Sequence, residues 1–574
     1  MRALISALVT IAILLPSAVR AQKPRGKVET SDHRRLLGIS VSQYLYLPAS
    51  TYDSDGPANA RADFSVLMKS LGANLKIPEA QVFELSDSAA GAKRTAPTRE
   101  AIDLLVGQFL NGSRGDDQIV LIFAGTAIEV DGSAYLVPLD GDSKSPATMI
   151  ALDWLFKQLE KCPARQKLLI VDLNRLDPIH GLGRSPPMSE KVESALKNPP
   201  KGVQVWSACS AGQHSLKSRE PHKFEGRIIQ NGLFQSLLAT AAAAREKADV
   251  SASGDIPVSA LCDQINSELP RALQASGLGR FKQTSLAVGE VVERTVPAEE
   301  KNTPRPPVHL AAWPEDAAPA KEIQGILDEI AASEATDLPG DSAMQVGVVA
   351  LLPFSKKTMA RYGDDGTPFE EIEAKAQDYP LRLAIQRASA ALRAHAKDDS
   401  LRLISTISAA ELNAPKSQAK TNLTQLQRVP ARRLQLLEEI LADLDKAAEN
   451  RAKEKSPRWQ VQFDLFRARM LTQYARIYEY NAVIGQIRKD ALPQLDAKNG
   501  EVGWRLISQN VMQSGAEAKE NAKRAAKQYA RIINDHPGTP WAVIAQREKS
   551  QPTGLTWVAT TDVPPPPPRP PKRP

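Results

Sequence analysis

The stretch from Asp117 to Asp142, DQIVLIFAGTAIEVDGSAYLVPLDGD, decides the fold of the amino-terminal half of this chain. It begins with an unbroken apolar run, Gln118 to Ala124, of the kind found in strands that are buried on both faces of a parallel sheet. This run leads into Gly125-Thr126-Ala127, and Tyr135-Leu136-Val137-Pro138 follows. The pattern predicts a buried strand that carries Thr126 near its carboxyl end.

A second apolar run, Lys167 to Pro178 (KLLIVDLNRLDP), ends in Asp172-Leu173-Asn174-Arg175. Short apolar runs alternate with helical periodicity from about Arg34 to Glu293, which predicts the α/β class, a mostly parallel sheet flanked by helices. The expected strands are Leu36–Val41, Gln81–Leu85, Gln118–Ala124, Leu168–Asp172 and Val203–Ser207. The expected helices include Ala58–Leu71, Arg99–Leu110 and Leu152–Lys161.

These two strands resemble the caspase and metacaspase family of clan CD cysteine peptidases. In that family the first strand ends in Gly-His-Gly before a YLVP-type segment, and the second ends in Asp-x-Cys-Arg. Thr126 stands at the position of the family histidine and Asn174 at that of the family cysteine. The resemblance implies a caspase-type sheet in a catalytically degenerate protein, of a planctomycete-like bacterial type.

The chemistry of this family explains why the two substitutions matter. Its peptide hydrolysis needs a nucleophilic thiolate and an imidazole that transfers the proton to the leaving amine. Asn174 offers neither an ionisable proton nor a nucleophilic atom, and the hydroxyl of Thr126 would itself need a base. We therefore expect no catalytic residue at either position, and the chain is interpreted as a pseudoprotease.

A third run, Trp206 to Ser215 (WSACSAGQHS), resembles the metacaspase segment that shapes the pocket for the residue before the scissile bond. Cys209, Gln213 and Ser215 match that segment, but Ala211 replaces its acidic residue. The resemblance implies a degenerate pocket formed by Asp172, Cys209, Ala211, Gln213 and Ser215. Asp172 is expected to orient backbone amides at the strand end. Asn231-Gly232-Leu233-Phe234 resembles the start of a late helix of the family.

An active enzyme remains the alternative if the nucleophile has moved. Cys209, paired with His214 or His180, is the set that could supply a thiol and a base. Asp140 and Asp142 could suggest calcium, but they lack the rest of an ion-binding loop and are expected to cap a turn. We expect no metal and no cofactor.

The composition excludes other classes of protein. The formal charge is +7 over 574 residues. It falls to +5 without residues 1–21, which carry Arg2 and Arg20 and no acid. Such a small excess of basic residues does not indicate a nucleic-acid-binding protein. The three cysteines, Cys162, Cys209 and Cys262, form no disulfide scaffold.

The amino terminus has the form of a secretory signal. Residues 1–21 combine Arg2, an apolar run and a small residue at a cleavage position, which predicts a signal peptide. No later stretch is apolar enough to cross a bilayer. We expect a protein exported to the periplasm or cell envelope, or secreted, without a membrane span after signal removal.

The rest of the chain divides by composition. Residues 27–295 are expected to form the caspase-like domain, 296–320 a linker rich in Pro and Ala, and 321–560 a mainly α-helical domain. His536-Pro537-Gly538 followed by Thr539-Pro540 is similar to a junction in tetratricopeptide-like repeats, although no second copy recurs. Residues 561–574 form a basic, Pro-rich tail that should be exposed polyproline II. We expect a binding or scaffold protein with an unidentified protein or peptide partner.

Overall fold

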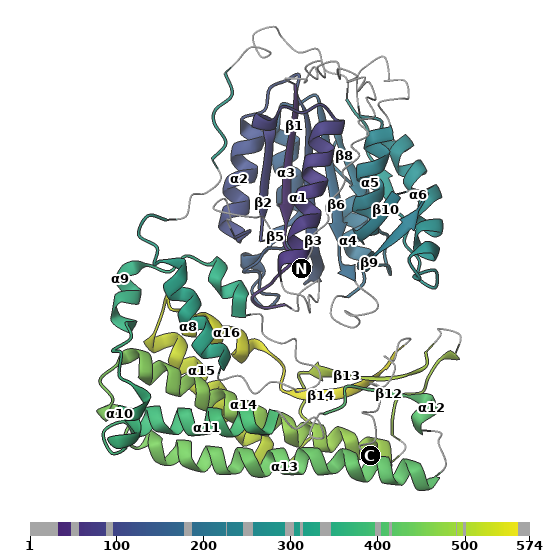
Figure 1. Ribbon diagram of the computed structural model, residues 1–574. Helices are drawn as coiled ribbons and strands as arrows, with labels where there is room; N and C mark the ends of the chain where they lie inside the picture. Colours follow the sequence, from purple (N-terminus) through teal and green to yellow (C-terminus); the bar gives the residue numbers. More distant parts are fainter. Residues whose placement is uncertain are drawn as a thin grey trace, which may run out of the picture.

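The structure is a computed structural model in two parts, an α/β part and a mainly helical part (Figure 1). It describes residues 33–47, 57–87, 96–176, 186–225, 227–244, 256–292, 304–309, 314–332, 346–396, 403–412, 416–489, 491–497 and 501–560. The expected signal peptide and Pro-rich tail lie outside these residues. None of the helices within these residues has the length and apolar content needed to cross a membrane.

A central sheet organises the α/β part. Its strand order is β11-β8-β6-β3-β1-β2. Neighbouring strands are parallel except at β11, which is antiparallel to β8. The strands are β1 (Arg34–Ser40), β2 (Val82–Ser86), β3 (Gln118–Val130), β6 (Gln166–Leu173), β8 (Val203–Ser207) and β11 (Leu286–Val288). Each of the five expected strands is present, and β8 has the expected bounds.

Alternate residues of the buried strands face opposite layers, because successive side chains of a strand point to opposite faces. On β3, Leu121 and Phe123 pack with the helices α2 to α4, whereas Val120 and Ile122 pack with α1, α5 and α6. The helices are α1 (Pro57–Asn74), α2 (Arg99–Asn111), α3 (Leu152–Lys161), α4 (Glu190–Lys197), α5 (Leu233–Ala244) and α6 (Val258–Ala275), with short η1 (Glu79–Gln81) and η2 (Pro146–Thr148). Such a sheet with helices on both faces is consistent with a caspase-like fold.

Small accessory strands extend the carboxyl end of the sheet. The long strand β3 continues beyond the parallel ladder and pairs with β4 (Ser133–Val137), which pairs with β5 (Ile150–Ala151). A separate sheet has the order β10-β9-β7. Its strands are β7 (Arg175–Leu176), β9 (Ser215–Phe224) and β10 (Arg227–Gly232). β7 directly follows Asn174, so this sheet borders the expected site.

Several residues of the expected linker make contacts with the rest of the protein. Arg305 pairs with Asp117 at 2.6 Å, and the backbone amide of His309 donates to Oε1 of Gln108. Farther on, Ala317 and Ala318 are buried, and Ala318 donates to the carbonyl of Phe354. The linker therefore contacts both parts: Arg305 and His309 bond to the α/β part, and Ala318 bonds to the helical part.

The carboxyl-terminal part is mainly helical, as expected. Its α-helices are α8 (Ala320–Ala332), α9 (Lys356–Met359), α10 (Phe369–Ala374), α11 (Pro380–Ala396), α12 (Ala409–Leu412), α13 (Lys416–Ala448), α14 (Pro457–Arg488), α15 (Ala516–Asp535) and α16 (Pro540–Ser550). Its short turns of helix are η4 (Val346–Leu351), η5 (Ala360–Tyr362) and η7 (Arg451–Lys453). The junction expected at Thr539 is present: its hydroxyl caps α16 by accepting from the amide of Ala542.

One element of this part was not expected from the sequence. A three-stranded antiparallel sheet has the order β12-β13-β14. Its strands are β12 (Thr406–Ser408), β13 (Gly503–Gln509) and β14 (Gly554–Thr560). Trp504 and Trp557 lie on β13 and β14, and Trp557 is buried and donates to the carbonyl of Val483 on α14.

The end of the main sheet that carries β5 faces the helical part (Figure 1). A hydrogen bond joins the two parts there: Nζ of Lys144 donates to the carbonyl of Ser550 at 2.9 Å. The expected site, at the carboxyl ends of the strands, therefore lies at the end of the sheet that is nearer to the carboxyl-terminal helical part.

Candidate functional site

Thr126 and Asn174 are the first residues after the parallel pairing of β3 with β6 ends. The parallel register of β3 and β6 ends with Gly125 opposite Leu173, so the next residues of the two strands are neighbours. Thr126 then pairs with Val137 of β4 and is buried. The structure thus brings together the two positions that the sequence placed at one edge of the sheet.

Asn174 acts as a clamp between the two strands. Its backbone amide donates to the carbonyl of Gly125 at 2.8 Å, and its Oδ1 accepts from the amide of Ala127 at 2.7 Å. Its φ of +53° lies in the left-handed region, which asparagine tolerates better than most residues. The side chain is fully buried, with 0% exposure. Asn174 therefore holds the strand ends in register.

Cys209 lies behind this clamp and not at the surface. It is 0% exposed, and its sulfur contacts the backbone carbonyls of Leu173 at 3.6 Å and Gln213 at 3.9 Å. Burial, together with the nearby carboxylates of Asp172 and Glu193, raises the pKa of the Cys209 thiol. The thiol therefore stays protonated at neutral pH, and a protonated thiol is a poor nucleophile.

The structure does not pair Cys209 with a base among the described residues. His214 is half-buried and has interactions of its own, and the sulfur's contacts are with carbonyls. His180 lies outside the described residues. The geometry thus gives Cys209 the environment of a buried structural thiol.

Two other expected pocket residues have structural partners. Oε1 of Gln213 accepts from the amide of Thr284 at 2.7 Å. The amide of Ala211 donates to Oε1 of Glu193 on α4 at 3.0 Å. The carboxylate of Glu193 thus lies next to Ala211, which stands where the resembling family has an acidic residue. Glu193 is also paired with Lys197 at 2.8 Å. The contact with Lys197, followed by the Ala211 bond, lowers the pKa of Glu193.

Asp172 and Ser215 belong instead to a polar cluster that the sequence did not reveal. Oδ2 of Asp172 accepts from Nε2 of Gln235 at 2.7 Å and lies 3.4 Å from Nε of Arg175. Ser215 is the register partner of Arg175 in the pairing of β7 with β9. The expectation that Asp172 orients backbone amides is wrong. Its carboxylate contacts the side chains of Gln235 on α5 and of Arg175 instead.

Gln235 is the residue that sequence reasoning missed most completely. It lies 63 positions from Asp172 in the chain, on the first turn of α5. No local pattern predicts such a contact. The available signal was the position itself, directly after Gly232-Leu233-Phe234, which places Gln235 at the start of a helix that covers the sheet.

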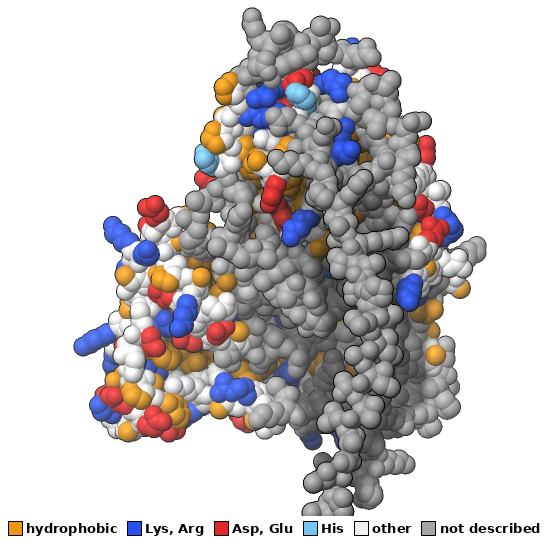
Figure 2. All heavy atoms as spheres, turned by 45° about the horizontal axis from the view of Figure 1, so that its top comes forward, with side chains coloured by type: hydrophobic (Ala, Val, Ile, Leu, Met, Phe, Trp, Pro, Cys, Tyr) orange, Lys and Arg blue, Asp and Glu red, His pale blue; other side chains and the backbone are white. Residues whose placement is uncertain are grey.

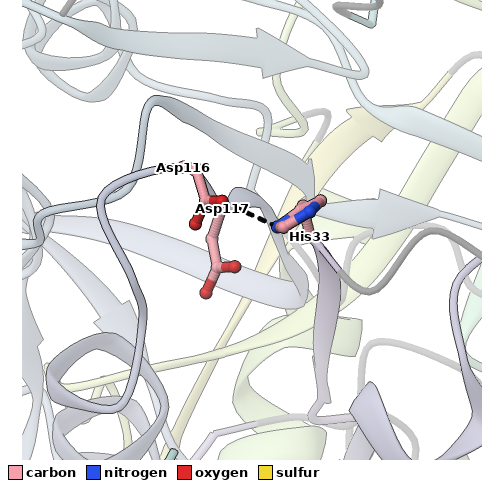
Figure 3. Close-up of side chains that lie close together, drawn as sticks. All are labelled: His33, Asp116 and Asp117. Carbon is pink, nitrogen blue, oxygen red and sulfur yellow. Dashed lines mark ion pairs between the residues drawn. The ribbon is translucent and has the colours of Figure 1, made fainter. Parts of the chain in front are cut away.

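A second group of titratable residues lies at the opposite end of the strands. His33, Asp116 and Asp117 each offer one possible ligand atom, and these atoms lie within 4.8 Å of one another (Figure 3). Nδ1 of His33 is 2.9 Å from Asp116. Asp117, however, already pairs with Arg305 and accepts from the amide of Arg114. A dication there would compete with an arginine for a carboxylate, so the trio is a weak metal site.

Asp142 has the turn-capping role that the sequence predicts, whereas Asp140 bonds to the start of a distant helix. Oδ1 of Asp140 accepts from the amide of Arg99, at the start of α2, at 2.7 Å. Oδ1 of Asp142 accepts from the amide of Lys144 at 2.9 Å. Both carboxylates therefore stabilise loops.

The described residues on the face shown in Figure 2 carry charges of both signs. Among the described residues of that face, Lys and Arg side chains are interspersed with Asp and Glu (Figure 2). Nucleic-acid binding proteins instead gather basic side chains in a patch or stripe.

Comparisons with known proteins add little to this description. No protein-family profile matches the chain, and no curated protein matches it in sequence. Among solved structures, the Drosophila initiator caspase Dronc is similar at 10% sequence identity and a TM-score of 0.24, over 49% of this chain and 92% of the caspase chain. A likeness of this size supports no inference about function. The fold is compatible with a caspase-like arrangement, and the site must be judged by its own residues.

Proposed function

We propose that this chain is a non-catalytic protein of caspase-like fold that binds a peptide or protein partner. The observation that carries the proposal is Asn174. Where the resemblance would place a nucleophile, a fully buried amide accepts the backbone hydrogen bond of Ala127. The side chain thus has a structural role that a reactive thiolate could not share.

Without a thiol at position 174 and an imidazole at position 126, these two positions supply neither the nucleophile nor the proton-transferring base of the family's reaction. Removing one member of a catalytic unit costs about as much as removing all of them, roughly 10⁶-fold in a well-studied protease. Thr126 is buried, and within the described ranges its hydroxyl makes no hydrogen bond to a histidine that could take its proton. The carboxyl ends of β3 and β6 therefore lie side by side, but the family positions there lack a nucleophile and a base.

The alternative, a peptidase with Cys209 as a relocated nucleophile, is disfavoured by geometry. A nucleophilic cysteine needs a lowered pKa and access to substrate. Cys209 has neither, since its sulfur is fully buried and its pKa is raised. An opening of this edge would have to expose the sulfur before it could react.

A scaffold role and export complete the proposal. Residues 1–21 favour export, and the helical part offers a large second surface for partners. Export is tested by amino-terminal sequencing of protein from the native cell. A chain that begins near Gln22 supports it, whereas an intact Met1 in the cytosolic fraction contradicts it.

The absence of catalysis is tested with the purified full chain and fluorogenic peptides cleaved after Arg, Lys or Asp. We expect no turnover above that of a Cys209→Ala variant. Turnover that disappears in Cys209→Ala would replace the proposal with the peptidase alternative.

A further inference from the structure

Polar atoms without partners gather at one place in the described part of the α/β fold. Buried side-chain atoms that make no hydrogen bond are Oδ1 of Asp172, Nδ2 of Asn174, Nε and Nη2 of Arg175, Oγ of Ser215 and Oε1 of Gln235. Each of these residues is more than nine-tenths buried. An unsatisfied buried polar atom costs about 1–3 kcal/mol, so six such atoms on five residues indicate a missing binding partner.

Four of the residues are joined by contacts already described, and the fifth, Asn174, lies between Asp172 and Arg175 in the chain. Asp172 bonds Gln235 and lies 3.4 Å from Arg175, and Ser215 is opposite Arg175 in the strand pairing. Gly232 allows this approach, since a Cβ there would lie 2.9 Å from Nη2 of Arg175. We name Asp172, Asn174, Arg175, Ser215 and Gln235 the amide cluster.

The charges within the amide cluster cancel. Asp172 supplies one negative charge and Arg175 one positive charge, and the other three members are neutral at any ordinary pH. An additional buried charge would lack a partner of its own, because the two ions already face each other. The cluster therefore suits a neutral polar group better than an ion.

The free atoms also include both donors and acceptors. Asn174 and Arg175 offer N–H donors, Ser215 can donate, and Asp172 and Gln235 offer oxygen acceptors. A carboxamide has an oxygen that accepts and an NH₂ group that donates twice. A carboxylate would leave the oxygens of Asp172 and Gln235 unpaired, and an ammonium group would leave the donors unpaired.

We propose that the amide cluster binds the carboxamide side chain of a glutamine or asparagine in a peptide partner. This inference rests on the proposed function, since it specifies what a peptide must present to the same edge of the sheet. It differs from a site for a basic or acidic side chain, which would need an uncancelled charge.

The test uses the purified full chain and fluorescein-labelled alanine peptides that carry Gln, Glu, Lys or Ala at one central position. Fluorescence polarisation measures the Kd of each. We expect the Gln peptide to bind at least about tenfold more tightly than the other three, the ratio set by one unpaired buried group. Equal affinities, or preference for Glu or Lys, would overturn the inference.

Charge-altering variants sharpen the test. Asp172→Asn leaves Arg175 uncompensated and should move the preference from Gln to Glu, while Arg175→Gln should move it to Lys. Glu129→Gln, a change of the same kind at an exposed position of β3, should leave the preference unchanged. Circular dichroism checks folding, and if the variants do not fold, the wild-type ranking decides.

The two proposals fail differently. If no peptide of the set binds, the amide cluster holds only ordered water, and both peptide binding at this edge and the inference are rejected. If peptides bind without regard to the central side chain, the proposed function stands and the amide specificity is wrong.

Discussion

The side-chain oxygen of Asn174 accepts the backbone amide of Ala127 at 2.7 Å and so ties the end of β6 to the continuation of β3. The two residues are 47 positions apart in the chain. Because Ala127 is buried, its amide has no access to water and depends on this acceptor. The position that the family resemblance assigns to a nucleophile is therefore part of the framework.

Asn174→Ala should destabilise this edge by about 1–3 kcal/mol, because a buried amide loses its acceptor. Asn174→Asp keeps an oxygen at the same place and serves as the matched control. Hydrogen exchange of the Ala127 amide in the full chain measures the effect locally. Exchange should accelerate in Asn174→Ala only, and equal rates in both variants would show that the bond contributes nothing.

Cys209 should resist thiol reagents in the native protein. Its burial and raised pKa leave little thiolate at pH 8, so labelling by iodoacetamide should require denaturant. Peptide mapping by mass spectrometry locates the label. Rapid native labelling at Cys209 would favour the peptidase alternative.

The double variant Thr126→His with Asn174→Cys should have a more reactive thiol than Asn174→Cys alone. The two positions directly follow the Gly125–Leu173 register pair, and a neighbouring imidazole lowers the pKa of a thiol. The pH dependence of alkylation measures the difference. If the two variants alkylate with the same profile, the two side chains do not meet.

Acid should weaken the helical part through His536. Its Nδ1 lies 3.0 Å from the hydroxyl of Tyr362, its Nε2 is buried without a partner, and burial lowers the pKa of the imidazole. Asp464 and Asp535 oppose this shift, whereas Arg451 and Arg531 add to it.

The sign follows from linkage. At pH values below about 6.5 the unfolded chain takes up a proton at His536 more readily than the folded one, so the stabilisation is complete above that pH and is lost as pH falls through the folded-state pKa. Urea unfolding at pH 7.5 and 5.5 should show a smaller pH effect in His536→Gln than in Tyr362→Phe, which keeps the imidazole. The same pH effect in both variants would exclude His536 as a source.

The contact of Arg305 with Asp117 should protect part of the linker from proteolysis. Asp117→Asn removes the carboxylate charge that holds Arg305 at 2.6 Å, so subtilisin should cut near residues 304–309 faster in this variant. Asp116→Asn, one position away, is the control because Asp116 pairs with His33. If both variants are cut near residues 304–309 at the rate of the unaltered protein, the contact does not restrain the linker.

Local patterns in the sequence predicted the five main strands of the α/β part and the positions of Thr126 and Asn174 near the carboxyl ends of two of them. Both depend on periodicity and on the rule that parallel strands end at a common edge, and both can be read from adjacent residues. The cap at Thr539 and the turn at Asp142 were predictable for the same reason, since their partners lie three and two positions away in the chain, whereas the partner of Asp140 is the amide of Arg99, 41 positions away.

Only the tertiary structure decided the character of the site. The contact of Gln235 with Asp172, the burial of Cys209 and the role of Asn174 as a clamp join residues 36 to 63 positions apart. The small sheet of β12, β13 and β14 likewise gathers strands from distant segments. Such contacts depend on how whole elements pack, and packing is a property of the folded chain that no local pattern of residues contains.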